Sequence, residues 1–157
     1  MQKDGWLTMR LLLDTTILID YFSRREPFFD DCVQLRAMQV FGDAELWVSA
    51  KSFTDVFYVL QKPLGYEKVQ RMFTESADFL KVCSIDSADI MKASSSKWAD
   101  FEDCLVHVCA EKIKADFLIT RDREGFSRAS IPVKSPAEFL MWVEKSKGLV
   151  YEEVSLA

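Results

Sequence analysis

The chain has 157 residues, the usual size of one domain, and we expect a single domain over residues 1–157 with a core from about residue 9 to 145 and short loose ends. Apolar residues make up 49% and aromatic residues 13%, which supplies a hydrophobic core and excludes a disordered chain. The formal net charge of -5 argues against binding of nucleic acid through a broad basic field. It does not exclude an enzyme whose acidic site reaches phosphate through metal ions.

The cysteines and the N-terminal region indicate a reducing compartment. The spacing of the cysteines is neither that of a zinc site nor that of a small secreted scaffold, so we expect reduced, mostly buried thiols at Cys32, Cys83, Cys104 and Cys109. Asp4, Arg10 and Asp14 interrupt the apolar residues near the start of the chain. The sequence therefore predicts neither a signal peptide nor a membrane span, and a cytoplasmic location is expected.

Five short β-rich runs alternate with helical patterns. The expected strands are Met9–Leu13, Leu46–Ser49, Leu80–Ile85, Phe117–Thr120 and Ile131–Val133. The first and fourth are nearly continuous apolar stretches, as in strands covered on both faces of a parallel sheet. Strands separated by helices imply right-handed crossovers, so we predict an α/β domain with a parallel sheet flanked by helices.

Start and stop signals delimit the helices. The clearest start is Ser135-Pro136-Ala137-Glu138, which has the order of N-cap, first-turn proline and capping-box acid. Pro63 and Gly65 interrupt a helical pattern and predict a helical hairpin. The expected helices are Ala50–Gln61, Tyr66–Phe79, Asp86 or Ser87 to about Lys97, about Asp100 to Lys114, and Pro136 to about Lys145.

Two carboxylates directly follow strands. Asp14 ends the run Leu11–Leu13, and Asp122 comes just after the run Leu118–Thr120. In open parallel sheets, ligands bind beyond the carboxyl ends of the strands, so acids at these positions are candidates for a site. A carboxylate over the end of a sheet is desolvated, and each therefore needs a cation or hydrogen-bond donors as partners.

Further candidates lie in helices. Asp100 and Asp103 are three residues apart at a helix start and share one face, whereas Glu102 is expected to point elsewhere. Asp100 also suits the role of a simple N-cap. Asp55 is a carboxylate in an apolar stretch of helix, where a residue of poor helix propensity suggests a role in a site. The alternative is that Asp55 is simply exposed on the outer face of the helix. If these acids converge, their hard oxygen ligands select Mg²⁺ or Mn²⁺, as in a phosphodiesterase.

Three segments, in this order and spacing, resemble the PIN-domain nucleases, including the VapC-like toxins. They are Leu11–Leu18, Asp100–Leu105 and Ala115–Asp122. The resemblance spans roughly Met9 to Met141, most of the chain, and implies a Rossmann-like sheet with an acidic pocket at the carboxyl ends of its strands.

The resemblance also implies the roles of individual residues. It assigns the core acids, as catalytic and metal-binding residues, to Asp14, Asp55, Asp103 and Asp122. Asp100 would be an auxiliary carboxylate at the metal, and Thr16 and Thr120 look like the small hydroxyl positions that orient a carboxylate or a water. The sequence departs from the family at Asp55, where glutamate is usual, and at Gly125, where many relatives carry another acid.

The implied activity is a Mg²⁺- or Mn²⁺-dependent endoribonuclease that hydrolyses RNA, possibly as the toxin of a toxin–antitoxin pair. The resemblance implies an RNA substrate, a small antitoxin protein and a homodimer as partners, and no membrane. The expected phosphate contacts are Arg121 and Arg123, with Lys112, Arg128 and Lys134 as further candidates. His107, the only histidine, follows Asp103 by one helical turn and is better interpreted as structural.

Other functions fit less well. A receiver domain needs an adjacent acidic pair after its first strand, and an aspartyl phosphatase needs a second Asp two residues later, whereas Thr15 and Thr16 follow Asp14. The stronger rival is a catalytically weak or inactive PIN-fold protein that acts as a nucleic-acid or protein binding module. Metal binding distinguishes the two, since the nuclease needs a cation and the module does not.

Overall fold

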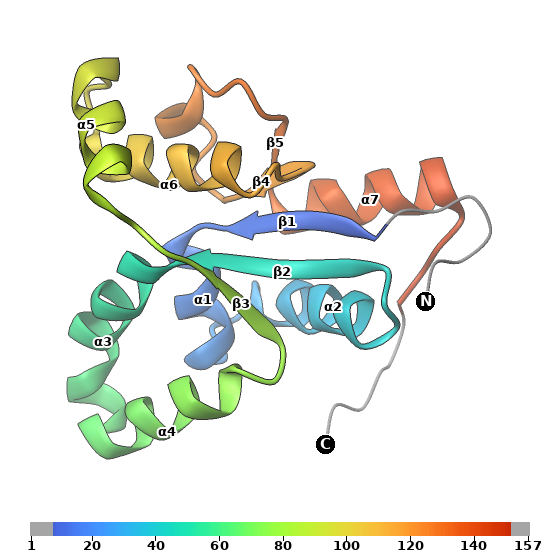
Figure 1. The fold of residues 1–157 in the computed structure, drawn as a ribbon. Coiled ribbons are helices and arrows are strands. Elements are labelled where there is room, and N and C mark those ends of the chain that lie inside the picture. Colours follow the sequence, from blue (N-terminus) through green and yellow to red (C-terminus); the bar gives the residue numbers. More distant parts are fainter. Residues whose placement is uncertain (1–7, 152–157) are drawn as a thin grey trace.

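The computed structural model describes residues 8–151, which form one five-stranded sheet with helices on both faces (Figure 1). The strands are β1 (Met9–Leu13), β2 (Ala44–Ser49), β3 (Leu80–Cys83), β4 (Phe117–Ile119) and β5 (Val133–Lys134). All neighbouring strands are parallel, in the order β3-β2-β1-β4-β5. The predicted α/β fold is confirmed, and β1 and β4 are the nearly continuous apolar strands that the sequence indicated, with Arg10 as the exposed exception in β1.

The last strand begins two residues later and ends one residue later than predicted. Pro132 has no N–H to donate, so it contributes only its carbonyl, which accepts from the Leu118 N–H at 2.9 Å. The next bond in the ladder runs from the Thr120 N–H to the Lys134 carbonyl at 3.0 Å. The pairing therefore begins with Pro132 as an acceptor alone and is completed at Val133–Lys134.

Seven α-helices and one short 3₁₀ helix connect the strands within residues 8–151. They are α1 (Thr15–Phe22), α2 (Phe29–Val40), α3 (Ala50–Leu64), α4 (Tyr66–Ser76), α5 (Ser87–Ser96), α6 (Phe101–Lys112), η1 (Glu124–Phe126) and α7 (Pro136–Lys147). The predicted capping box at Ser135 and Glu138 is present at the start of α7. No helix among the described residues is long and apolar enough to cross a membrane.

The break between α3 and α4 lies at Gly65 alone. The prediction that α3 would end at Gln61 is wrong by three residues, because Pro63 is accommodated in the last turn of the helix. Gly65 has a φ of 86°, a backbone conformation that side chains disfavour, and its N–H donates to the Gln61 carbonyl at 2.9 Å. The glycine therefore ends one helix and starts the next, which gives the predicted hairpin.

The two faces of the sheet bury different helices (Figure 1). On one face, Leu11 and Leu13 pack in a core with residues of α1, α2, α3, α4 and α7. On the other face, Leu12 packs against Cys109 and Ala110 of α6, and α5 covers α6 from outside. Because β1 is central and enclosed on both faces, the residue that follows it is held firmly at the carboxyl edge of the sheet.

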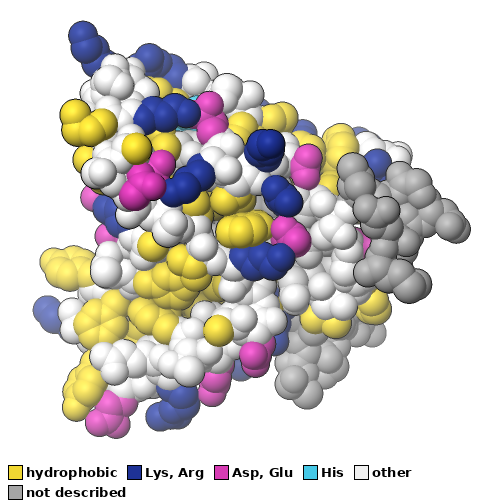
Figure 2. Space-filling view, in the orientation of Figure 1, with side chains coloured by type: hydrophobic (Ala, Val, Ile, Leu, Met, Phe, Trp, Pro, Cys, Tyr) yellow, Lys and Arg dark blue, Asp and Glu magenta, His cyan; other side chains and the backbone are white. Residues whose placement is uncertain are grey.

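Charged side chains on the outer surface are mixed in sign. In the view of Figure 2, basic and acidic side chains are interspersed, with apolar side chains gathered among them. This face carries no broad basic field, in agreement with the net charge of -5.

Candidate active site

Asp14 is the first acid at the carboxyl edge of the sheet. It follows β1 directly and caps α1, with Oδ1 accepting from the Thr15 N–H at 2.8 Å. Its Oδ2 accepts from the Thr120 hydroxyl at 2.8 Å, and the residue is only 7% exposed. Burial raises the pKa of Asp14, although these hydrogen bonds act to lower it, and the charge of Asp122 raises it further. Asp14 is thus a buried carboxylate whose orientation is fixed by two donors.

Thr120 connects Asp14 to Asp122. Its fully buried hydroxyl donates to Asp14 and accepts from the Asp122 N–H at 3.0 Å, so it has a partner both as a donor and as an acceptor. Asp122 in turn accepts from the Gly125 N–H at 3.1 Å through Oδ1. A single hydroxyl therefore sets the position of two acids that come from the ends of neighbouring strands.

Asp103 approaches the same place from the first turn of α6. Its pKa is raised to about 7, first by burial and then by the charges of Asp100, Asp14, Asp122 and Glu102. Asp100 is the N-cap of α6, as its alternative interpretation predicted, and its Oδ1 accepts from the Asp103 N–H at 3.0 Å. Residues far apart in the chain thus crowd their negative charge around Asp103.

Gly125 lies against two of these carboxylates. A Cβ atom at this position would collide with Asp103 Oδ2 and would lie 2.7 Å from Asp122 Oδ2. The two oxygens therefore face the same point of the backbone. This packing explains why a glycine stands where the resemblance implies another acid, since a side chain here displaces Asp103 or Asp122.

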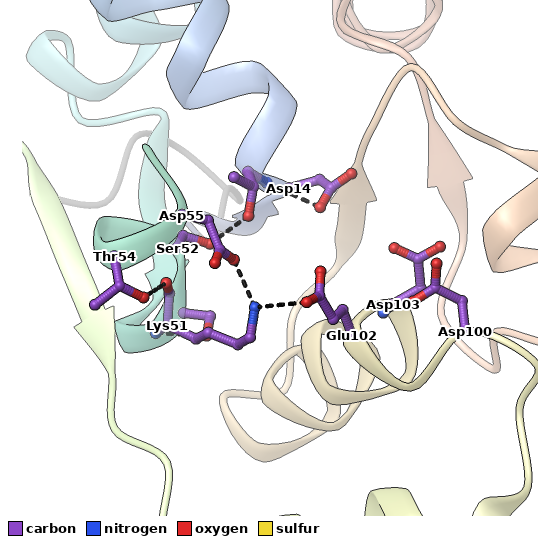
Figure 3. A network of polar contacts seen from close by, with 10 residues as sticks. Asp14, Lys51, Ser52, Thr54, Asp55, Asp100, Glu102 and Asp103 are labelled. Atoms are coloured by element: carbon purple, nitrogen blue, oxygen red, sulfur yellow. Dashed lines mark hydrogen bonds and ion pairs between the residues drawn. The ribbon is translucent and has the colours of Figure 1, made fainter. Parts of the chain in front are cut away.

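Asp55 lies on the opposite wall, on α3. Its Oδ2 accepts from Lys51 Nζ at 2.6 Å, one turn earlier on the same helix, and the Lys51 ammonium also lies 3.3 Å from Glu102 Oε1 of α6 (Figure 3). Partial burial acts to lower the pKa of Lys51, but Asp55 and Glu102 together raise it, so the ammonium stays charged. Asp55 thus has a positive partner inside the protein.

One pocket between α1, α3 and α6 collects all of these groups. Its lining includes the five acids that the sequence singled out, namely Asp14, Asp55, Asp100, Asp103 and Asp122. Thr16 also lines it, and its buried Oγ1 makes no hydrogen bond within the described residues, although it lies close enough to Asp14 to lower the pKa of that carboxyl slightly. The structure therefore brings the separated acids to one edge of the sheet.

Residues 10–124, which are more than half of the chain, match the sequence pattern of the PIN domain family. This chain belongs to the PIN domain family. A curated PIN relative, ribonuclease VapC1 of Aquifex aeolicus (strain VF5), is 24% identical over 135 residues, which cover 83% of this chain and 92% of the relative.

Solved structures place the same fold in toxin–antitoxin proteins. A toxin–antitoxin complex from Klebsiella pneumoniae contains a chain that is 25% identical, with a TM-score of 0.58 over 80% of this PIN domain chain and 97% of its own. VapBC-1 from nontypeable Haemophilus influenzae has a TM-score of 0.62 at 17% identity, over 82% of this chain and 99% of that one. These likenesses support the fold.

The structure of this PIN domain places the predicted phosphate contacts outside the pocket. Arg121 forms two hydrogen bonds with the fully buried Asp20, at 2.8 and 3.2 Å, and its guanidinium lies 3.8 Å from the centre of the Phe28 ring. Arg123 forms an ion pair with Glu138 at 2.6 Å. Neither arginine lines the acidic pocket.

The other basic candidates and His107 are also engaged elsewhere. Lys112 pairs with Asp89 at 2.7 Å, and Arg128 donates to the carbonyls of Ser96 and Lys97. His107 Nε2 accepts from the Ser130 N–H at 3.0 Å, and its ring stacks on Trp98 at 5.0 Å between centroids. His107 thus packs in a structural cluster, as the sequence indicated. The pocket lining includes none of these residues, and Lys134 is absent from it as well.

Several residues of the pocket were not found from the sequence, among them Glu102, Ser52 and Lys51. The prediction that Glu102 points elsewhere is wrong, because Glu102 lines the pocket and pairs with Lys51. Ser52 Oγ lies 2.9 Å from Thr15 Oγ1 and joins the walls made by α3 and α1. The i, i+4 spacing of Lys51 and Asp55 was a usable signal for an ion pair, since residues four apart are neighbours on a helix.

The donor set of the pocket suits a hard divalent cation. Within residues 8–151, no lysine, arginine or histidine forms an ion pair with Asp14, Asp100, Asp103 or Asp122. No three acidic, histidine or cysteine side chains in this described part already surround a single point as a completed ligand set. Carboxylate oxygens are the ligands that Mg²⁺ and Mn²⁺ prefer, and Asp14, Asp103 and Asp122 line the same pocket. The chemistry of the residues present therefore fits the metal.

Proposed function

We propose that this PIN domain is a Mg²⁺- or Mn²⁺-dependent endoribonuclease and the toxin of a toxin–antitoxin pair. The observation that carries the proposal is the pocket in which Asp14, Asp103 and Asp122 crowd together with no basic partner among the described residues. Such crowding is unfavourable in the folded protein unless a cation compensates it. The sequence likeness to ribonuclease VapC1 supports RNA as the substrate class.

Each acid has a distinct part in this proposal. Asp14, Asp103 and Asp122 would hold the cation, with Asp55 and Asp100 at the margin of the pocket as outer carboxylates. When bound, such a cation lowers the pKa of an attacking water and neutralises charge on the phosphate. Thr120 and the Thr15 N–H keep the Asp14 carboxylate turned in one direction, while the Gly125 N–H orients Asp122.

The unpartnered Thr16 hydroxyl also suits this role. Its Oγ1 is buried at the pocket, where a hydroxyl without a hydrogen bond is costly. A water or a phosphate oxygen in the pocket would supply the missing partner. We therefore propose Thr16 as a residue that positions water beside Asp14.

RNA cleavage and metal response test the function together. We expect the wild-type protein to cleave structured or single-stranded RNA in Mn²⁺ and not in chelator, and Mn²⁺ to raise its melting temperature by several degrees. The double variant Asp14→Asn, Asp103→Asn should lose both responses. Asp30→Asn, which removes an exposed acid of α2 outside the pocket, should keep both.

The outcomes separate the nuclease from the binding module. If wild type and the double variant respond alike to Mn²⁺, the pocket assignment is wrong. If Mn²⁺ stabilises only the wild type but no RNA from a varied set is cleaved, the chain is an inactive PIN-fold protein that binds nucleic acid or protein.

The partners belong to the same proposal. Two solved structures of similar fold are a toxin–antitoxin complex from Klebsiella pneumoniae and VapBC-1 from nontypeable Haemophilus influenzae. We propose that a small antitoxin protein inhibits this chain and that the chain forms a homodimer. Size-exclusion chromatography with light scattering of the purified chain measures the oligomeric state, and the same measurement after co-expression with a candidate antitoxin tests the complex.

A further inference from the structure

The acidic pocket has two halves that differ in their compensation. On the side of β1, β4 and α6, Asp14, Asp103 and Asp122 have no ion pair with a basic residue within the described chain. On the side of α3, Asp55 and Glu102 share the Lys51 ammonium, at 2.6 and 3.3 Å (Figure 3). The first half lacks a cation and the second half already contains one.

The Lys51 ammonium is held where it lies. The Lys51 N–H donates to the Ser49 hydroxyl at 3.1 Å in the first turn of α3, which fixes the backbone from which the side chain extends. The ammonium then bridges α3 and α6 across the pocket, and the side chain is only 29% exposed. Two carboxylates from different helices thus restrain it on the side of Asp55.

This arrangement makes Asp55 a poor ligand for a second metal. The charge of its carboxylate is partly compensated at hydrogen-bonding distance by the Lys51 ammonium, which Glu102 shares, and its side chain is one methylene shorter than the glutamate that the resemblance leads one to expect. A divalent cation beside Asp55 would also meet the like charge of the ammonium. Two metals are therefore disfavoured in this pocket by the protein's own charge.

We propose that Lys51 is a built-in cation, which takes the place of a second metal beside Asp55 and limits this pocket to one divalent ion, on Asp14, Asp103 and Asp122. Lys51 then neutralises charge on the Asp55 side of the pocket. The proposal rests on the proposed metal-dependent function and adds the stoichiometry and the residue that sets it.

Counting bound Mn²⁺ tests the proposal without an activity measurement. Titration of the purified full chain, with free Mn²⁺ followed by electron paramagnetic resonance, should give one ion per chain in the wild type. Lys51→Met should gain a second, weaker Mn²⁺ ion, because it leaves Asp55 and Glu102 without their cation. Lys51→Arg keeps the charge and should bind one.

A matched control separates the pocket from overall charge. Lys81→Met also removes one positive charge and one ion pair, to Glu45 at 2.8 Å, but Lys81 lies on β3 outside the pocket. It should bind one ion. Asp55→Asn should bind one ion with an affinity within about threefold of the wild type, whereas Asp103→Asn should weaken it more than about tenfold. Asp55→Asn keeps the proposal testable if Lys51→Met does not fold.

The results that overturn the proposal are distinct from those that overturn the function. Two ions on the wild type, or one ion of unchanged affinity on folded Lys51→Met, overturn the role of Lys51 and leave the nuclease proposal in place. Loss of the single ion in Asp55→Asn does the same. A wild-type protein that binds no Mn²⁺ overturns both.

Discussion

Asp103 should make the metal-free protein less stable as the pH rises. Its pKa is raised from 3.8 to about 7 in the folded protein, so between these values the folded state keeps a proton that the unfolded state has released. The free energy of unfolding therefore falls as the pH rises from about 4 to about 7 and then levels. The full shift corresponds to roughly 4 kcal/mol. Because Asp103 is partly exposed to solvent, screening reduces this to about 1–2 kcal/mol.

The comparison with Asp103→Asn isolates this effect from other carboxylates. In chelator, the two proteins should have nearly equal stability at pH 4, and the variant should be more stable by about 1–2 kcal/mol at pH 8. Urea unfolding followed by tryptophan fluorescence at several pH values measures both. Saturating Mg²⁺ should restore the wild type at pH 8 and leave the variant unchanged. A variant that is less stable than the wild type at pH 8, or a difference that does not grow with pH, would refute the charge-crowding argument.

Three further substitutions test the geometry of the pocket and its supports. Gly125→Ala places a Cβ against two carboxylates and should weaken Mn²⁺ binding by at least about tenfold in a titration, with unchanged affinity contradicting the close approach. Thr120→Val removes a donor to Asp14 and should cost about 2 kcal/mol in urea unfolding, whereas a cost below about 0.5 would show that the hydroxyl is dispensable. Asp20→Ala leaves the partly buried Arg121 without its partner and should cost about 2–4 kcal/mol, which thermal unfolding checks against an Asp30→Ala control.

Much of the fold follows from the sequence because its signals are local. The apolar runs of β1 and β4 are nearly continuous because helices cover both faces of these strands. Such a run can be recognised in the sequence without knowing which strands pair with it. The capping box at Ser135 is equally local. The end of α3 was predicted too early because the last turn of the helix accommodates Pro63. The helix ends instead at Gly65, which adopts a positive φ.

The candidate site also contains residues that could be predicted from local sequence signals and residues that could not. Asp14 and Asp122 were accessible because the carboxyl ends of parallel strands meet at one edge, so a topological rule replaces knowledge of contacts. The ion-pair partners of Arg121 and Glu102 could not be predicted from the sequence. Arg121 follows the same strand as Asp122, yet its partner is Asp20, about a hundred positions earlier in the sequence and in the first helix. Pairing across elements depends on side-chain direction, which sequence spacing does not give.

The position of Lys51 shows how such pairing changes the chemistry of a site. Counting acids in the sequence suggests a pocket with five negative groups and leaves the number of metals open. In the structure, Asp55 and the additional acid Glu102 of another helix share one lysine, so that the negative charge in this half of the pocket is partly compensated before any ion enters. The remaining carboxylates keep a charge that only an external cation compensates. On the proposal made above, the ion pair across α3 and α6, rather than the number of acids, sets the number of metal ions that the pocket holds.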